Sequence, residues 1–385
     1  LTKQSQSKNK SASLNVNSAD ITIKALDFMN RRLNDLIITS KPSNQHLGMH
    51  LSSQEIEGDL EWISPSKTEV TGEIIAKLTK LHLPDGYDKL SSQPADEQIV
   101  QLDQEYPALN IQVADFKLGE KNLGALEVHA HEIKNDWVID QLKISNPDSI
   151  LLAEGRWHNW TRSPNTNLTF SLSANDVGNT LKRFGQADIV KGGISSISGQ
   201  LNWPGSPHQF KTKGLNGNFR LGAAKGQIIK VKPGVGRLFG LLTLQSLPRR
   251  LTLDFRDLFS EGFAFDEISG SAKITNGVMH SDDFFMTGPA AETKIHGDID
   301  LNKETQQLNI KVTPHISDSL SLAALAGGPI VGAAAFIAQK LLKDPLNKIA
   351  QSEYTITGTW DNPVEEDTVK QQQDKQTSSS PLNAQ

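Results

Sequence analysis

The chain has 385 residues, of which 37% are hydrophobic and 22% are charged, and its formal net charge is −5. This composition is typical of a folded protein, and the negative charge excludes the basic surface on which a nucleic-acid partner depends. The absence of cysteine excludes disulfides, thiol nucleophiles, cysteine-bound zinc and iron–sulfur clusters.

The two ends of the chain differ from the rest in composition. Residues 1–13 and 364–385 are mostly polar and charged, so both segments are predicted to be disordered. The chain begins at Leu1, with neither a start methionine nor a signal-peptide pattern. We therefore interpret it as the tail of a longer protein.

Between these ends, apolar and polar residues alternate along most of the chain. In residues 251–256 (LTLDFR), for example, alternate side chains would point to opposite faces of a strand. Asn276-Gly277 is typical of a tight hairpin turn, and residues 302–305 provide a short polar connection. The fold is therefore predicted to be mainly β, with antiparallel neighbours. Further strands are predicted at residues 21–23, 109–113, 168–172, 219–221, 299–301 and 308–312.

A glycine followed closely by a tryptophan recurs at residues 58–62, 155–157, 199–203 and 358–360. In each copy the glycine is expected where a strand begins. The irregular spacing between copies argues against a solenoid, so a loosely repetitive sheet is the favoured interpretation.

Two segments depart from the alternation. In residues 175–185, possible N-caps precede an apolar stripe and Gly185 ends it, which predicts one short helix. Residues 320–339 carry no charge, but Gly327-Gly328-Pro329 interrupts them, so a broken helical hairpin over residues 318–350 is predicted instead of one membrane span. Packing of this hairpin against the protein's own sheet is favoured over insertion into a bilayer. Its apolar face, a candidate membrane or plug element, includes Leu325, Ile330, Phe336, Ile337 and Leu341.

The sequence offers little catalytic chemistry. His129 and His131 would share one strand face and could hold a metal with Glu127 or Glu132, but Glu132 would point away, and a solvated strand face is favoured. The glycines of residues 234–240 lack the dinucleotide-binding spacing, and the chain has neither a nucleophile elbow nor a phosphate-binding loop. No catalytic residue, metal or cofactor is therefore predicted.

The run of residues 233–242, continued by residues 247–259, is long and distinctive. Together with residues 262–270 and 354–363, it resembles the C-terminal region of the YhdP branch of the AsmA-like family of Gram-negative bacteria. The resemblance is close from Pro233 onward and looser upstream. It divides the chain into a β-groove segment of residues 14–232 and an AsmA-like C-terminal β region of residues 233–363.

This resemblance implies a protein that an upstream segment, absent from this chain, anchors in the inner membrane. It implies a long, twisted, open β-groove that crosses the periplasm and carries phospholipid toward the outer membrane, supporting the permeability barrier of that membrane. The helical segment at residues 318–350 would then plug the groove or contact the outer membrane.

The residue pattern leads to a compatible interpretation. A long sheet with one apolar face needs a cover, and two helical segments are too few to provide it. Acyl chains could fill a sheet curled into an open groove, although two sheets packed face to face would show the same alternation. Arg249 and Arg250 could contact an anionic headgroup. The residues expected to line the groove are Leu168, Phe170, Leu172, Phe219, Leu221, Leu251, Leu253, Phe255, Ile299, Leu301, Ile310 and Val312.

Phospholipid transport without catalysis is therefore the predicted function. The alternative is a structural or assembly scaffold of the cell envelope, whose sheet edges pair with strands of protein partners. An enzyme acting on envelope glycans is the least favoured, because no pair of carboxylates is recognisable in the sequence.

Overall fold

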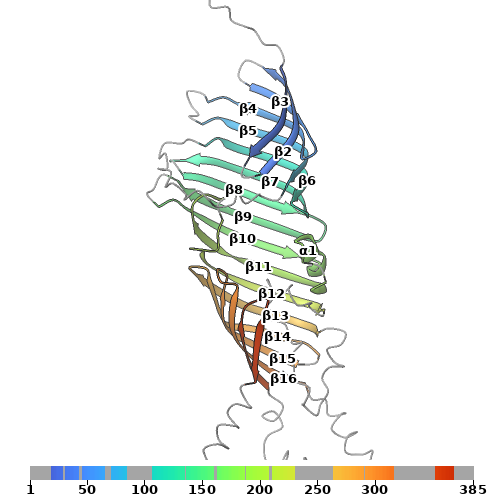
Figure 1. The fold of residues 1–385 in the computed structure, drawn as a ribbon, viewed down its shortest axis with the longest axis vertical. Coiled ribbons are helices and arrows are strands. Elements are labelled where there is room, and N and C mark those ends of the chain that lie inside the picture. The colour runs from blue at the N-terminus through green and yellow to red at the C-terminus, as the bar shows by residue number, and fades with distance from the viewer. Residues whose placement is uncertain are drawn as a thin grey trace, which may run out of the picture.

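One sheet dominates the structure (Figure 1). Its 18 strands are accompanied by one short helix within the part of the chain that the structure describes. The computed structural model describes residues 19–28, 31–42, 46–65, 71–84, 106–134, 136–159, 163–186, 188–207, 210–229, 263–289, 291–315 and 352–367.

The strands follow the alternation in the sequence, because successive side chains of a strand point to opposite faces. In β15, for example, buried and exposed residues alternate from Ala291 to His296. The first strands are β1 (Ala19–Phe28), β2 (Arg31–Pro42), β3 (His46–Ser52), β4 (Ile56–Ile63), β5 (Glu73–Leu83), β6 (Ala108–Leu118), β7 (Lys121–Ile133), β8 (Asp136–Ser145) and β9 (Ser149–His158). The others are β10 (Asn165–Ala174), β11 (Val190–Pro204), β12 (Asn216–Ile228), β13 (Phe263–Thr275), β14 (Val278–Thr287), β15 (Ala291–Asp300), β16 (Thr305–Pro314), β17 (Ser352–Gly358) and β18 (Pro363–Asp367).

Each strand pairs with the next one along the chain, so the sheet is a long meander from β1 to β18. One pair, β5 with β6, is parallel, with Glu73 opposite Ala108. This corrects the prediction that neighbouring strands are antiparallel throughout. The reason is the length of the connection, since residues 84–107 are enough chain to return to the starting edge of the sheet. The sheet stays open and twists along its length (Figure 1).

Both predicted turns are confirmed. Asn276 and Gly277 join β13 to β14 with positive φ angles of 51° and 82°, as a tight hairpin turn requires. The polar connection predicted near residues 302–305 joins β15 to β16. There the backbone N–H groups of Asn302 and Lys303 both donate to Oδ1 of Asp300 at 3.0 Å.

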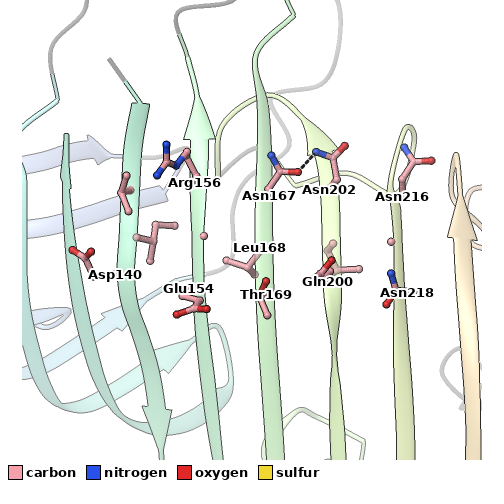
Figure 2. Close-up of a pocket in the computed structure, with 15 residues that line it drawn as sticks. Asp140, Glu154, Arg156, Asn167, Leu168, Thr169, Gln200, Asn202, Asn216 and Asn218 are labelled. Atoms are coloured by element: carbon pink, nitrogen blue, oxygen red, sulfur yellow. Dashed lines mark hydrogen bonds between the residues drawn. The ribbon is translucent and has the colours of Figure 1, made fainter. Parts of the chain in front are cut away.

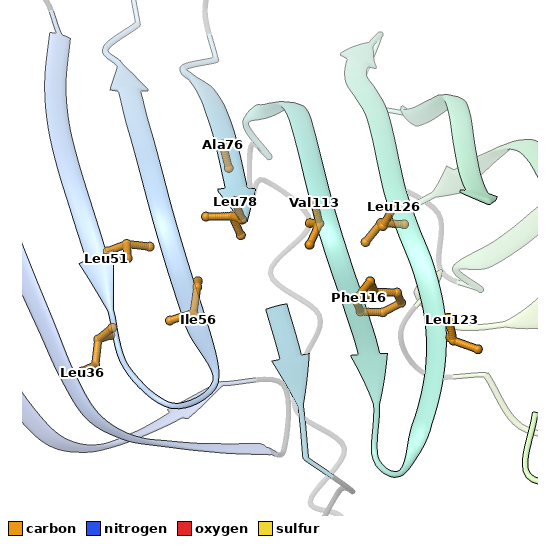
Figure 3. Close-up of a cluster of buried hydrophobic side chains, with 9 residues drawn as sticks. All are labelled: Leu36, Leu51, Ile56, Ala76, Leu78, Val113, Phe116, Leu123 and Leu126. Carbon is orange, nitrogen blue, oxygen red and sulfur yellow. The ribbon is translucent and has the colours of Figure 1, made fainter. Parts of the chain in front are cut away.

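The buried apolar side chains form four clusters that follow one another along one face of the sheet, which we call the inner face. The strand register makes this face continuous; Ile295, Ile310 and Tyr354, for example, lie opposite one another on β15, β16 and β17. The sheet is thus curled into the long, open hydrophobic groove that was predicted. Figure 3 shows the first cluster, which comprises Leu36, Leu51, Ile56, Ala76, Leu78, Val113, Phe116, Leu123 and Leu126.

Glycines within strands allow the sheet to bend. At Gly297 a Cβ atom would overlap the backbone carbonyl oxygen of Gln307 on β16, and at Gly217 it would overlap that of Gln200 on β11. Such close approach requires glycine, and glycine kinks are an established means of curving a sheet. The prediction that the glycines of the Gly–Trp pattern lie where strands begin is wrong for three of them. Gly58, Gly155 and Gly199 lie inside strands, where an added Cβ would overlap a neighbouring strand in the same way.

The helix α1 (Val177–Arg183) confirms the short helix predicted near residues 175–185. Asp176 is its N-cap, and Oδ1 of this residue accepts a hydrogen bond from the backbone N–H of Asn179 at 2.8 Å. Near the other end, Nε of Arg183 donates to Oδ2 of Asp148 at 2.6 Å. The helix contacts both β11 and β7, so it lies across the ends of the strands between them, at one edge of the sheet (Figure 1).

Replacing Asp176 by alanine removes the N-cap and is expected to destabilise α1 by about 1 kcal/mol, because the N–H of Asn179 loses its acceptor. Hydrogen exchange read by mass spectrometry would detect this as faster exchange in residues 177–183. Lys182→Ala, an exposed change on the same helix, is the control. Equal protection in the two variants would mean that packing against β11, and not the cap, holds the helix.

Several predicted segments lie partly or wholly outside the described residues. These include residues 1–13, the helical hairpin at 318–350 and most of the tail at 364–385. Val364, the first residue of the predicted disordered tail, instead pairs with Thr357 as part of β18. The division near residue 233 stays a prediction, and the strands on either side of it, β12 and β13, pair directly.

Candidate functional site

The structure brings the described members of the predicted groove lining onto one surface. On β10, Leu168, Phe170 and Leu172 point to the inner face, opposite Leu201, Gly199 and Ile197 of β11. Their role in binding stays a prediction. The same face carries Phe219 and Leu221 of β12, Ile299 of β15, and Ile310 and Val312 of β16, and Leu301 lies at the end of this face, just after β15.

The remaining predicted site residues lie outside the described residues. They are Arg249, Arg250, Leu251, Leu253, Phe255, Leu325, Ile330, Phe336, Ile337 and Leu341.

The centre of the inner face is more open than the regions on either side. A row of apolar side chains crosses β9 to β12, with Leu151, Leu172, Ile197 and Leu221 directly opposite one another. Each is partly exposed, as is the neighbouring Phe170. By contrast, Met286 of β14 and Ile295 of β15 are 0% and 2% exposed. We call the five partly exposed residues the central patch: Leu151, Phe170, Leu172, Ile197 and Leu221.

The sequence interpretation missed the cluster of β2 to β7 shown in Figure 3. Alternation at residues 109–113 does place Val113 on the inner face. However, the register shifts after Val113, so the next inner residue is Phe116, three positions later. A bulge of this kind reverses the parity within a strand, and the alternation alone therefore follows only part of the lining.

The outer face behind Phe170 of the central patch is mainly polar. Figure 2 shows a shallow hollow there, lined mainly by amide and charged side chains of β8 to β12. The side-chain amide of Asn202 donates to Oδ1 of Asn167 at 2.6 Å, and Thr169, Gln200 and Asn218 are exposed. Exposed apolar side chains also occur elsewhere on this face, such as Ile150 and Leu152 of β9 at 46% and 43% exposure. The continuous apolar surface of the four clusters, which an elongated apolar ligand would match, belongs to the inner face.

Histidines of the outer face pair with carboxylates across the strands. Nδ1 of His131 lies 2.6 Å from Oδ2 of Asp140. Glu127, considered above as a metal ligand beside His129 and His131, instead accepts a hydrogen bond from Nζ of Lys143 at 2.8 Å. Among the described residues, no group of three histidine or acidic side chains is arranged to hold a metal ion. Other pairs are His46 with Glu61, His50 with Asp59, His82 with Asp115, His158 with Asp136 and His280 with Asp298.

Two of these pairs predict a pH dependence of stability. Hydrogen bonds that the imidazoles donate to Asp59 and Asp298 raise the pKa of His50 and His280, respectively. A raised pKa in the folded state means that the stabilisation is fully present below the unfolded pKa of about 6.5 and is lost as the pH rises through the folded pKa. Thermal unfolding of a His50→Gln/His280→Gln variant should therefore show a deficit against the parent chain near pH 5 that disappears near pH 9. The deficit should be small, because both imidazoles are exposed and screened.

His296→Gln, which changes an exposed histidine of β15, provides the control for this pH series. A deficit of the double variant that is constant from acid to alkaline pH would contradict the prediction. It would assign the loss to packing and not to the charge of the imidazoles.

Comparisons with known proteins agree with this geometry. A family model described as "YhdP protein" matches residues 1–365. Over 225 residues the chain is 34% identical to the "Intermembrane phospholipid transporter YhdP" of Escherichia coli (strain K12), an alignment covering 58% of this chain and 18% of that relative. The chain thus matches less than a fifth of the relative's length. No solved structure matches the chain.

In the part of the chain that the structure describes, no helix has the length and apolar character to cross a bilayer.

Proposed function

Because this chain belongs to the YhdP family, we propose that it forms part of a conduit carrying phospholipid across the periplasm, from the inner to the outer membrane. The observation that carries the proposal is the continuous apolar inner face of a single open sheet, with the partly exposed central patch in its middle. The relative named above, a phospholipid transporter, supports the same class of cargo.

The physical argument rests on acyl chains. Each methylene removed from water contributes about 0.8 kcal/mol whatever headgroup the lipid carries, so an apolar trough holds phospholipids without specific contacts. At roughly 4.8 Å per strand, the sheet extends about 80 Å from β1 to β18. An acyl chain spans about 15 Å, half of a bilayer's hydrocarbon core, so several lipids fit in succession. Movement along the trough breaks no covalent bond and needs no catalytic residue.

The proposal extends to the surroundings of this chain. An upstream segment would anchor the protein in the inner membrane, and this chain would reach toward the outer membrane. Arg249 and Arg250 would contact headgroups. The apolar residues of the segment at 318–350 would plug the groove or contact the outer membrane: Leu325, Ile330, Phe336, Ile337 and Leu341.

Site-specific photocrosslinking in cells tests the proposal directly. A photoreactive residue replaces Phe170 of the central patch or, as the matched control on the opposite face, Thr169, in the full-length protein. We expect phospholipid adducts at Phe170 and none at Thr169, identified by mass spectrometry. Absence of phospholipid at both positions would overturn the proposal, and a protein adduct at Thr169 would then favour an envelope scaffold acting through protein partners.

A further inference from the structure

Every tryptophan that the structure describes lies at the same edge of the sheet. Trp62, Trp157 and Trp203 are the next-to-last residues of β4, β9 and β11, Trp137 is the second residue of β8, and Trp360 follows β17. The register places these strand ends together. Trp137 is opposite Trp157, the chain reverses at each antiparallel pair, and the parallel strands β5 and β6 both start at this edge. From β4 to β17 this edge extends about 60 Å, at roughly 4.8 Å per strand. We call these five residues the tryptophan rim.

The rim side chains belong to the inner face. Trp157 is two and four positions from Gly155 and Ala153, so it shares their face, and Trp137 shares the face of the buried Ile139. Trp203 is part of a buried inner cluster, and Trp360 packs against another. Trp62 lies two positions from Leu60, which packs against the first cluster. The groove therefore has an indole at intervals along one of its two long margins.

The opposite margin differs in chemistry. It carries α1, and the aromatic side chains near it include Phe184, which packs against the first cluster, and Phe263 at the start of β13. Phenylalanine has no polar atom, whereas an indole joins a large apolar ring to one N–H donor. The two margins therefore offer a bound amphiphile different surroundings.

Two of the rim indoles join the apolar lining to polar backbone groups. Nε1 of Trp203 donates to the carbonyl oxygen of Ser206 at 3.1 Å, and Nε1 of Trp137 donates to that of Pro107 at 3.3 Å. Nε1 of Trp157 is buried and has no hydrogen-bond partner among the described residues. Tyr106 stacks edge-on against the Trp157 ring, with 4.7 Å between ring centroids, and burial raises the pKa of its phenol.

Hydrogen-bonding side chains follow the same edge on the outer face. Arg156 and Asn202 lie near the ends of β9 and β11, and Asn167 and Asn216 near the starts of β10 and β12, where Figure 2 shows them in one row. Guanidinium and amide N–H groups donate to phosphate and ester oxygens. Across this margin the apolar lining is thus followed by the indoles and then by the polar donors. The same order is found at a membrane–water interface.

We propose that phospholipids lie in the groove with their headgroups along the tryptophan rim and their acyl chains directed toward the margin that carries α1. This inference rests on the proposed function, because it assigns an orientation to the same cargo. It identifies the tryptophan rim as the margin at which the polar part of each lipid meets water during transport. The indoles then align glycerol and phosphate groups while the acyl chains remain on the apolar lining.

Intrinsic tryptophan fluorescence tests the orientation, because five of the six tryptophans are in the rim. The purified chain carrying Trp160→Phe is loaded with phosphatidylcholine labelled with a nitroxide either on the choline group or at the middle of one acyl chain. We expect the headgroup label to quench the emission at least about twofold more strongly than the chain label, as for interfacial tryptophan in bilayers. Stronger quenching by the chain label would overturn the orientation while leaving lipid binding established.

Mass spectrometry of the extracted lipid separates the two proposals. Bound lipid without quenching by either label would also overturn the orientation, because the lipid would then lie away from the rim. No bound lipid would overturn the proposed function itself. A second variant, Trp62→Phe/Trp137→Phe/Trp360→Phe, removes the partly exposed rim indoles but keeps aromatic packing. It should lose most of the headgroup-dependent quenching, and retention of that quenching would count against the proposal.

Discussion

Replacing Gly297 by alanine is expected to lower the free energy of unfolding by roughly 2–4 kcal/mol, a large effect for one methyl group. Gly297 lies inside β15 with a φ angle of 139°, a conformation that residues with a Cβ rarely adopt. The added Cβ would also overlap the carbonyl oxygen of Gln307 on β16. Relief requires β15 and β16 to separate at Gly297–Leu308, which disturbs the pairs on either side, His296–Asn309 and Asp298–Gln307. Urea unfolding followed by circular dichroism measures the loss.

Gly222→Ala is the matched control, because Gly222 lies inside the neighbouring part of the same sheet with no atom within 4 Å of an added Cβ. Its φ angle is not positive. Alanine there should be neutral or stabilising by about 0.4–1 kcal/mol, through the unfolded chain. Equal stability of Gly297→Ala and Gly222→Ala would contradict the view that glycine kinks curve the sheet.

The Gly–Trp pattern shows what the sequence reveals and what it leaves open. It correctly marks positions at which the sheet is unusual, since Gly58, Gly155 and Gly199 all crowd a neighbouring backbone. It did not reveal that these glycines lie inside strands, because a bend depends on which strand is adjacent and in which register. Those are long-range properties that a local pattern does not contain.

Strand faces were predictable wherever the alternation was unbroken. Leu308 to Val312 alternates over its whole length, so Ile310 and Val312 share the inner face as parity requires. In β13 the inner residues change from Phe265 to Ile268, which reverses the parity. β13 stays in unbroken register with β12 across this change, and Lys225 of β12, which lies opposite it, has a positive φ angle of 57°. A local backbone conformation of this kind leaves no mark in the composition, so the sequence did not predict the change of face.

The tryptophan rim could not be predicted from the sequence, for a topological reason. Trp62 and Trp137 reach the same edge only because β5 and β6 are parallel. In an uninterrupted antiparallel meander, the end of β4 and the start of β8 would lie at opposite edges. The Gly–Trp pattern alone therefore does not bring the tryptophans to one edge, and the parallel pairing of β5 with β6 is the fact that does.

Replacing Phe170 by aspartate is expected to reduce the phospholipid that co-purifies with the chain about tenfold, which corresponds to about 1.4 kcal/mol of binding free energy. Phe170 is on the inner face, in the central patch, and is partly exposed. A carboxylate there would have to lose water when acyl chains cover it, and this cost opposes lipid binding. Because Phe170 belongs to none of the fully buried clusters, the fold should survive the change. Extraction of the purified chain followed by mass spectrometry gives the amount of lipid per protein.

Thr169→Asp is the control, because it adds the same charge one residue away on the exposed outer face. It should leave lipid occupancy unchanged, and circular dichroism should show the same strand content in both variants. Loss of lipid in both variants would assign the effect to net charge and not to the face of the sheet. Unchanged occupancy in Phe170→Asp would remove the central patch from the lipid path. The lipid would then have to occupy other inner-face regions, where Met286 and Ile295 are buried and a ligand gains less exposed apolar surface.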